Sequence, residues 1–259
     1  MEKTTIFTVQ DNCAFILLNR PSVFNSFNRA MALEVQAILD ECQERDDIRA
    51  VAISGEGRAF CAGQDLGEII APNAPELSQI LQEHYNPIVE RIRNLRKPVV
   101  AAVNGVAAGA GANLALACDI VIASQSASFI QAFSKIGLIP DSGGTFFLPR
   151  LVGFQRASAM MLLGEKVSAD DAEKIGMIYK SVPDDTFWDV VNKTVFQLAL
   201  MPTEALWLTK KALNASMNNS LSEQLELEDE LQNKASKTAD YKEGVNSFLE
   251  KRKPEFIGK

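Results

Sequence analysis

A single aspartate, Asp141, stands between a proline and a Ser-Gly-Gly turn in the stretch KIGLIPDSGGTF. Aspartate before such a turn commonly caps the next helix, because its side chain accepts hydrogen bonds from free main-chain N–H groups. A carboxylate can also transfer protons as a general acid and base when it lies beside a reacting carbon. The local sequence favours the helix cap and leaves the catalytic role open.

Two loops that contain glycine supply the other groups suited to chemistry. Cys61-Ala62-Gly63-Gln64-Asp65 follows one apolar strand, and Gly109-Ala110-Gly111 opens a helix after another. Ligands of α/β folds usually bind at this end of a sheet. Main-chain N–H groups from two such loops can meet on one oxygen and form an oxyanion hole. The same glycines are also typical of plain turns, and they do not follow the GxGxxG order of a dinucleotide site.

The segments around these loops alternate between strands and helices. Wholly apolar strands are typical of a parallel sheet that is covered on both faces. We therefore predict an α/β core over residues 1–200 and a helical region over 201–259. The predicted strands are Thr4–Val9, Cys13–Asn19, Ala50–Ser54, Val99–Val103 and Ile120–Ala123, and the predicted helices are Arg29–Arg45, Leu77–Leu95, a helix from about Gly109, Phe187–Leu200, Thr203–Met217, Leu221–Lys234 and Tyr241–Lys251.

The composition narrows the classes of partner. The net charge of −7 and the pI of about 5.0 argue against a nucleic-acid or anionic-membrane surface. Four scattered cysteines and one histidine, His84, suggest no transition-metal cluster. We expect free, buried thiols in a reducing compartment, and hence a cytoplasmic protein. We also expect no membrane-spanning helix, and we expect His84 to be a partly exposed helix residue.

Five stretches, in order along the whole chain, resemble the crotonase (enoyl-CoA hydratase/isomerase) superfamily. They are LNRP…NSF, GRAFCAGQDL, KPVVAAVNGVAAGAGANLALACDIVIA, GLIPDSGGT and YKEGVNSFLEKRKPEF. The resemblance implies an α/β fold with a crotonase-like spiral of ββα units and a helical C-terminal region, assembled as a homotrimer or a homohexamer. It also implies an acyl-CoA thioester as substrate. Coenzyme A would then be part of the substrate, and no prosthetic group is expected.

The resemblance assigns roles to particular positions. Ala62 and Ala110 correspond to the two main-chain donors of the family's oxyanion hole. The adenine end of the coenzyme is expected against Gln64-Asp65-Leu66. Phe248 and Lys251 match positions that close over the coenzyme, often from a neighbouring subunit. Residues 1–200 would thus hold the acyl-CoA site, and residues 201–259 would serve oligomerisation and coenzyme closure.

Two glutamates with which hydratases of this family activate water are replaced here by Asn113 and Phe133. Asn113 cannot act as a general base, and Phe133 would make a pocket drier. Related isomerases and a dehalogenase resemble this chain in carrying an aspartate at the position of Asp141. With both glutamates gone, the resemblance favours Asp141 as the acid–base group.

Within the family, the chain most resembles isomerases of phenylacetate degradation that convert ring-1,2-epoxyphenylacetyl-CoA to oxepin-CoA and shift enoyl-CoA double bonds. The stretches that carry this resemblance are FCAGQDL, YNPIV, AVNGVAAGAGANLAL, FSKIGLIPDSGGT and ADYKEGV. Other functions stay open. They are a general enoyl-CoA double-bond isomerase or hydratase of fatty-acid oxidation, an enzyme that uses Asp141 as a nucleophile, and a non-catalytic CoA-thioester-binding subunit that supports a partner hydratase.

Overall fold

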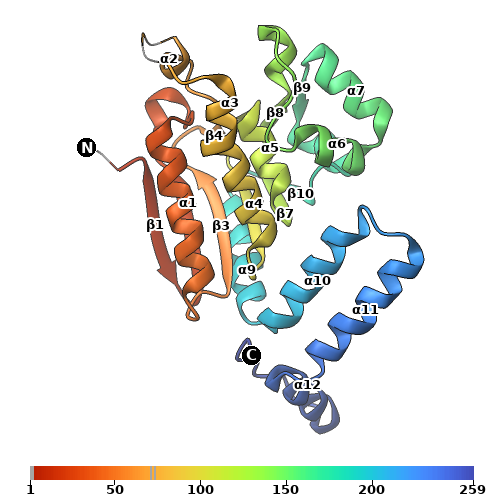
Figure 1. Ribbon diagram of the computed structural model, residues 1–259. Coiled ribbons are helices and arrows are strands. Elements are labelled where there is room, and N and C mark those ends of the chain that lie inside the picture. The colour runs from red at the N-terminus through yellow and green to blue at the C-terminus, as the bar shows by residue number, and fades with distance from the viewer. Residues whose placement is uncertain (1–2, 71, 73) are drawn as a thin grey trace.

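The main layer of the protein is a six-stranded sheet with the order β1-β2-β3-β5-β7-β10, drawn in Figure 1 from a computed structural model that describes residues 3–70, 72 and 74–259. The β1–β2 pair is antiparallel, and all the other neighbours are parallel. This arrangement confirms the hairpin and the parallel sheet predicted from the sequence. The strands are β1 (Thr5–Gln10), β2 (Cys13–Leu18), β3 (Ala50–Gly55), β5 (Val99–Val103), β7 (Ile120–Ser124) and β10 (Lys180–Val182).

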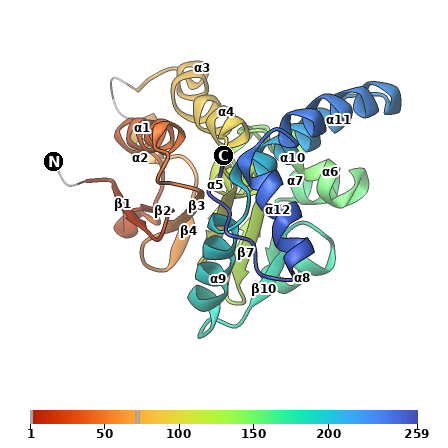
Figure 2. The ribbon, with the colours of Figure 1, turned by 90° about the horizontal axis from the view of Figure 1, so that it is seen from below.

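Helices cover both faces of this sheet, as Figure 2 shows in the view along the strands from below. On one face, α1 (Arg29–Glu44) and α4 (Asn86–Asn94) bury side chains such as Val51 of β3. On the other face, α9 (Phe187–Ala199) packs against the alternate residues, among them Ala52. The strand residues on both faces are apolar, since neither face of the sheet is exposed to solvent. This explains why the strands are continuous apolar runs in the sequence.

A second sheet has four very short strands in the order β4-β6-β8-β9. They are β4 (Ala59–Cys61), β6 (Val106–Ala108), β8 (Ser128–Ile130) and β9 (Lys166–Ser168). The consecutive pairs β3–β4, β5–β6 and β7–β8 each give one strand to the six-stranded sheet and one to this sheet. The repeated pair, followed by a helix, is the predicted ββα unit, and it confirms the predicted fold class.

The segment after β4 forms one wall of the candidate site. It contains α2 (Leu66–Ile69), α3 (Leu77–Ile80) and a π-helical turn (Leu81–Tyr85) that leads directly into α4. The segment is helical without a break from Leu77 to Asn94, which confirms the helix predicted over Leu77–Leu95, and the π-helical turn is a feature that the sequence did not predict. Such turns insert an extra residue into a helix and are frequent at functional sites.

The helix that follows β6 is α5 (Ala110–Ala117), which is buried along its whole length. Beyond β8, a 3₁₀ turn (Ala132–Ile136) leads to the loop of Asp141 and then to α6 (Gly144–Val152). Two further helices complete this part of the chain, α7 (Phe154–Leu163) and α8 (Ala169–Lys174). A 3₁₀ turn (Pro21–Val23) lies between β2 and α1.

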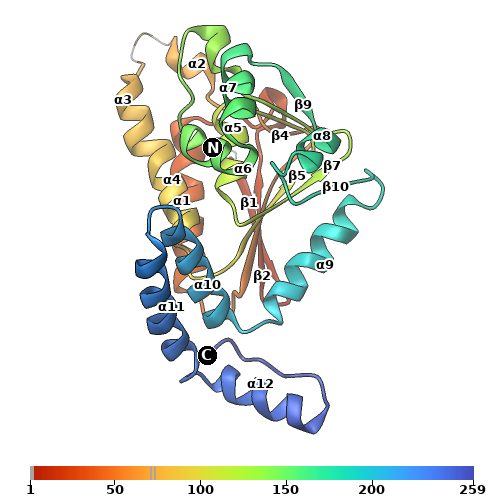
Figure 3. The same ribbon diagram turned by 90° about the vertical axis from the view of Figure 1, so that its right-hand side faces the viewer.

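The C-terminal region consists of α10 (Thr203–Ser216), α11 (Leu221–Ala235) and α12 (Ala239–Glu250), as predicted. The predicted capping box is also present, with reciprocal hydrogen bonds between Ser220 and Glu223 at the start of α11. In Figures 1 and 3, α12 lies at the opposite end of the molecule from α2.

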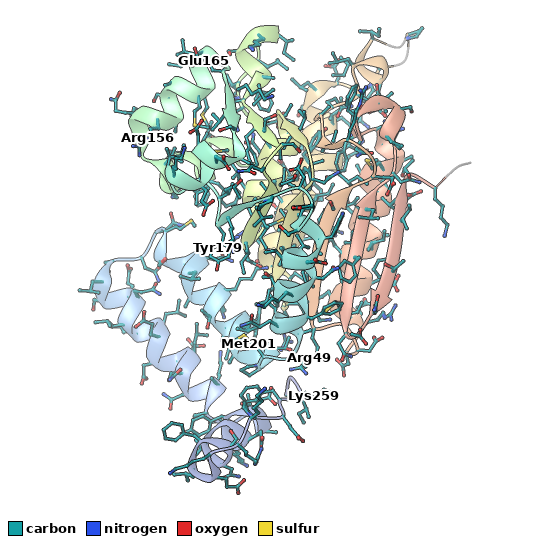
Figure 4. All side chains as sticks on the ribbon, turned by 180° about the vertical axis from the view of Figure 1, so that it is seen from behind. Arg49, Arg156, Glu165, Tyr179, Met201 and Lys259 are labelled. Atoms are coloured by element: carbon teal, nitrogen blue, oxygen red, sulfur yellow. The ribbon has the colours of Figure 1, made fainter. Side chains whose placement is uncertain are left out.

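Side chains of the core anchor this region. Lys210 of α10 is buried and makes an ion pair of 2.8 Å with Asp119. Arg49 donates hydrogen bonds to the hydroxyl of Thr203 and to the main-chain carbonyl oxygens of Met201 and Phe256. Figure 4 labels Arg49 and Met201 at this junction, from which α10 leaves the core. The chain therefore ties α10 firmly to residues 1–200, and the boundary at residue 200 stays a prediction.

All four cysteines are free and buried, as expected, and the reducing compartment stays a prediction. Within the described ranges, no helix combines the length and the apolar character that are needed to cross a membrane.

Candidate functional site

Asp141 does not cap the helix that follows it. Helix α6 begins at Gly144, its N-cap is Gly143, and no side chain caps it. The main-chain carbonyl oxygen of Asp141, rather than its carboxylate, accepts a hydrogen bond of 2.8 Å from the Gly144 N–H. The helix-cap interpretation of Asp141 is therefore wrong, and the carboxylate is left for another role.

The half-buried carboxylate of Asp141 lines a cavity of about 370 Å³. Burial raises the pKa of Asp141, and a hydrogen bond of 2.8 Å from the Ser142 hydroxyl to Oδ1 opposes that effect only in part. A raised pKa brings a carboxyl group nearer to the range in which it can both accept and return a proton. The apolar residues that line the same cavity include Val23, Leu66, Ile69, Leu77, Ile80, Phe133, Ile136 and Leu138.

The loop after β4 and the start of α5 also line this cavity, with Ala62, Gly63, Gln64, Gly109 and Ala110. The sequence therefore predicted correctly that the two glycine-bearing loops meet. The place that a Cβ on Gly63 would take lies 3.4 Å from the Ala110 nitrogen. The main chain of one loop thus approaches the helix start of the other closely, as two oxyanion donors require.

The Ala62 N–H is not free to act as one of these donors. It donates a hydrogen bond of 3.0 Å to the main-chain carbonyl oxygen of Phe24. Phe24 and Asn25 have φ angles of +54° and +55°, and this left-handed turn points the Phe24 carbonyl at the loop after β4. The structure therefore corrects the assignment of Ala62, which lines the cavity but has its N–H engaged.

Gln64 offers a free N–H in the same loop. Phe27 and Gln64 form a parallel β-bridge, in which the hydrogen bonds are made by the residues on either side of Gln64. The Phe27 N–H donates to Gly63 O at 2.7 Å, and the Asp65 N–H donates to Phe27 O at 2.8 Å. The Gln64 N–H points away from this bridge and has no acceptor among the described residues. Sequence reasoning missed this donor, because only the turn at Phe24 distinguishes it from Ala62.

The Ala110 N–H is the second free donor. Ala110 is the first residue of α5, where no acceptor within the helix exists. No other acceptor for it is found in the part of the chain that the structure describes. Gly109 precedes it with a φ of +53°, a conformation that favours glycine. The observed pair of free N–H groups at the cavity is therefore that of Gln64 and Ala110.

Polar side chains hold the Gln64 loop in place. Tyr85 of the π-helical turn donates a hydrogen bond of 3.0 Å to Gln64 Oε1, and Gln64 Nε2 donates one of 2.7 Å to Glu68. Asp65 caps α2 through the Gly67 N–H and pairs with Arg20 at 2.8 Å. Asp65 is thus engaged in structure, whereas Gln64 and the exposed Leu66 line the cavity.

Phe133 lines the cavity and Asn113 contacts the main chain of Asp141, and neither side chain adds charge. Phe133 is 6% exposed, and its ring lies 3.7 Å from the place that a Cβ on Gly109 would take. Asn113 is fully buried and donates a hydrogen bond to the main-chain carbonyl of Asp141. These positions agree with the predicted dry wall at Phe133. Among the described residues that line the cavity, Asp141 is the one that supplies a carboxylate.

Phe248 and Lys251 do not reach this cavity within the chain. Phe248 is 82% exposed on α12, and Lys251 follows that helix with a φ of +55°. Helix α12 lies far from α2 and α3 in Figures 1 and 3. Any closure of these residues over a coenzyme would therefore involve the cavity of a neighbouring subunit.

His84 differs from its sequence-based expectation. Its side chain is 1% exposed, and its Nδ1 has no hydrogen-bond partner among the described residues. Burial lowers the pKa of His84. The expectation that His84 is partly exposed is therefore wrong, and His84 is not one of the residues that line the cavity.

This fold is shared with a known class of enzymes. A family model described as enoyl-CoA hydratase/isomerase matches residues 8–259, and the chain belongs to that family. Among solved structures, an enoyl-CoA hydratase from Bacillus anthracis superposes with a TM-score of 0.95 at 32% identity, covering 99% of this chain and 100% of that one. An enoyl-CoA hydratase from Polaromonas sp. JS666 superposes with a TM-score of 0.91 at 31% identity, covering 97% and 99%.

Two curated relatives are more similar in sequence. The 1,2-epoxyphenylacetyl-CoA isomerase of Escherichia coli K12 is 48% identical over 97% of each chain. A probable enoyl-CoA hydratase of Rhodobacter capsulatus is 47% identical over 99% of this chain and 98% of that one. The family is therefore established, and both isomerase and hydratase names occur among similar proteins.

Proposed function

We propose that this protein is an acyl-CoA isomerase in which Asp141 is the acid–base group. The observation that carries the proposal is one carboxylate and two free main-chain N–H groups around one largely apolar cavity. A non-catalytic thioester-binding subunit would not need a half-buried carboxyl group with a raised pKa on its cavity wall. The alternative use of Asp141 as a nucleophile predicts a covalent acyl or aryl adduct, which mass spectrometry would detect.

In the proposed mechanism, the thioester carbonyl oxygen accepts hydrogen bonds from the N–H groups of Gln64 and Ala110. These donors stabilise the enolate oxygen that forms when the α-proton leaves. The ionised Asp141 takes this proton and returns it to the γ-carbon, so a β,γ double bond becomes an α,β double bond. No atom is gained or lost, and the carboxylate is regenerated.

The dry wall of the cavity favours isomerisation over hydration. Hydration needs groups that bind and activate water, and Asn113 and Phe133 cannot supply a base. The test compares two rates with straight-chain substrates: the double-bond shift of a 3-enoyl-CoA and the hydration of the matching 2-enoyl-CoA. We expect a fast shift and a slow hydration. Hydration as fast as the shift would contradict the proposal.

We further propose a ring-1,2-epoxide of phenylacetyl-CoA as the preferred substrate, with oxepin-CoA as product. The relative from Escherichia coli and the aromatic wall at Phe133 support this choice. Enolate formation would help to open the strained ring. Turnover of the aromatic epoxide should exceed turnover of straight-chain 3-enoyl thioesters, and the reverse order would favour a fatty-acid isomerase.

We also propose a homotrimer or homohexamer in the cytoplasm. The exposed apolar residues of α11 and α12, among them Leu225, Phe248 and Leu249, favour burial against another subunit. A groove between α10, α11 and α12 is lined by apolar residues such as Val245 and Phe256. Association with a partner hydratase is the alternative, and sedimentation of the pure protein would distinguish the two.

A further inference from the structure

Two buried amides stand behind the loop that carries Asp141. Asn113 of α5 and Gln131, which follows β8, are 0% and 1% exposed. Gln131 Nε2 donates a hydrogen bond of 2.8 Å to Asn113 Oδ1, and Asn113 Nδ2 donates one of 2.9 Å to the main-chain carbonyl oxygen of Asp141. The two side chains thus form a chain of hydrogen bonds that ends on Asp141.

The carbonyl of Asp141 fixes the orientation of both amides. A carbonyl oxygen only accepts, so Asn113 presents its NH₂ group to Asp141 and its oxygen to Gln131. Gln131 must then present its own NH₂ group to Asn113. This arrangement leaves Gln131 Oε1 buried without a partner among the described residues. A buried unpaired oxygen lowers stability, so the pair is better explained by orientation than by stability.

The loop that these amides contact has a demanding backbone. Ser142 and Gly143 adopt φ angles of +51° and +76°, and the first is unfavourable for a residue other than glycine. A Cβ on Gly144 would lie 2.3 Å from Asn113 Nδ2, so α6 approaches Asn113 closely. The hydrogen bond from Asn113 therefore reaches this loop at the residue directly before the two left-handed positions.

We propose that Asn113 and Gln131 are positioning residues that hold the Asp141 carboxylate beside the reacting carbon without adding charge. This inference rests on the proposed function of Asp141. An ionised carboxylate in place of Asn113 would have no hydrogen to donate to the Asp141 carbonyl oxygen. It would also add a second negative charge near the Asp141 carboxylate. Among the described residues, Tyr85 and Lys135 are the other titratable side chains that line the cavity with Asp141.

The central test is the double variant Asn113→Leu/Gln131→Met, which replaces both amides by apolar groups of similar shape. Exchange of both partners can be nearly neutral or stabilising, and the Asp141 carbonyl oxygen keeps its hydrogen bond from the Gly144 N–H. We therefore expect an unchanged or higher Tm, unchanged binding of phenylacetyl-CoA, and a kcat for 3-enoyl-CoA isomerisation that is roughly 10- to 100-fold lower. A purely structural role predicts instead that Tm falls together with kcat.

Asn214→Leu is the matched control. Asn214 of α10 is a half-buried amide with hydrogen bonds to Arg93, away from the cavity. This change should lower Tm and leave kcat close to wild type. If the double variant does not fold, Gln131→Met alone replaces it in the test. This change removes the unpaired Gln131 Oε1 and leaves Asn113 Oδ1 unpaired instead, so the number of unpaired buried oxygens stays the same.

The same changes in an Asp141→Asn background show whether the amides act through Asp141. We expect no further loss there, since residues that act through one group are not additive. A near-normal kcat in the double variant, or a further loss in the Asp141→Asn background, would overturn the inference. Near-normal activity of Asp141→Asn by itself would instead reject the proposed function, so the two failures are distinguishable.

Asn113→Asp gives a readout in pH. The added carboxylate near Asp141 should shift the acid limb of the kcat/KM profile to higher pH, because a second negative charge makes Asp141 harder to ionise. The positioning role would be contradicted if the acid limb of the kcat/KM profile of Asn113→Asp stayed unchanged and its kcat fell only because the protein unfolds.

Discussion

At the scale of single residues, one carboxyl group with a raised pKa carries the proposed chemistry. Only ionised Asp141 can accept the α-proton, so kcat/KM for the double-bond shift should fall as the pH drops through the raised pKa. The midpoint should lie above pH ~4, the ordinary aspartate value. A pH–rate profile measures it, and a midpoint at or below that value would contradict the role of burial.

Gly63 offers a second prediction at this scale. Its φ is +92°, and a Cβ there would lie 3.0 Å from Ala108 O and 3.4 Å from the Ala110 nitrogen. Gly63→Ala should therefore disturb the paired donors and lower kcat about 100-fold. Gly153→Ala is the matched control, because its φ of +80° carries the same strain with nothing within 4 Å. Equal kcat in both variants would argue against the donor pair.

The sequence predicted these residues unevenly, for physical reasons. Asp141 was predicted as the catalytic group because two glutamates of the family are missing, although its local sequence favoured a cap. The family resemblance indicated the Ala62 N–H as the donor, and the same loop offers several similar N–H groups, that of Gln64 among them. The left-handed turn at Phe24 decides between them, and nothing in the sequence indicates that a non-glycine residue adopts this conformation.

At the scale of elements, α10 is held to the core by an ion pair whose lysine is buried. Burial lowers the pKa of Lys210, and its partner Asp119 is 2.8 Å away. Lys210→Met removes one charge and leaves Asp119 less compensated, so the free energy of unfolding should fall by about 3 kcal/mol. The exposed neighbour Lys211 provides the control, since Lys211→Met should change it little. Urea denaturation measures both, and equal effects would contradict the anchoring role.

Long apolar strands and amphipathic helices were predictable at this scale, because their periodicity extends over many residues. The strands β4, β6, β8 and β9 have three residues each, which is too short for a period. The π-helical turn at Leu81–Tyr85 also leaves no mark in the sequence, yet it places Tyr85 against Gln64. Periodicity therefore predicted the helices that contribute Leu77, Ile80 and Ala110 to the cavity, but not the short strands or the π-helical turn.

At the scale of the whole molecule, α12, which carries Phe248, lies at the opposite end of the protein from α2, whose Leu66 and Ile69 line the cavity (Figure 3). If a neighbouring subunit completes each coenzyme site, two inactive variants should complement each other. Asp141→Asn and Phe248→Asp subunits, mixed and reassembled in equal amounts, should recover activity at about a quarter of the sites. Each variant alone should stay low, and an assay of the mixture measures the recovery.

No recovery on mixing, together with full activity of an isolated monomer, would contradict completion across subunits. Phe248→Asp suits this test because the side chain is 82% exposed in the single chain. Its loss should therefore weaken coenzyme binding without unfolding the subunit, and thermal denaturation of the single variant checks that requirement.

The most direct measurement of the whole account is proton exchange in the isosteric variant Asp141→Asn. Wild-type protein in deuterium oxide should exchange the α-protons of phenylacetyl-CoA, followed by NMR. The variant should bind this thioester with a similar Kd but exchange its α-protons about 10²- to 10⁴-fold more slowly. Exchange at the wild-type rate in Asp141→Asn would contradict the assignment of Asp141.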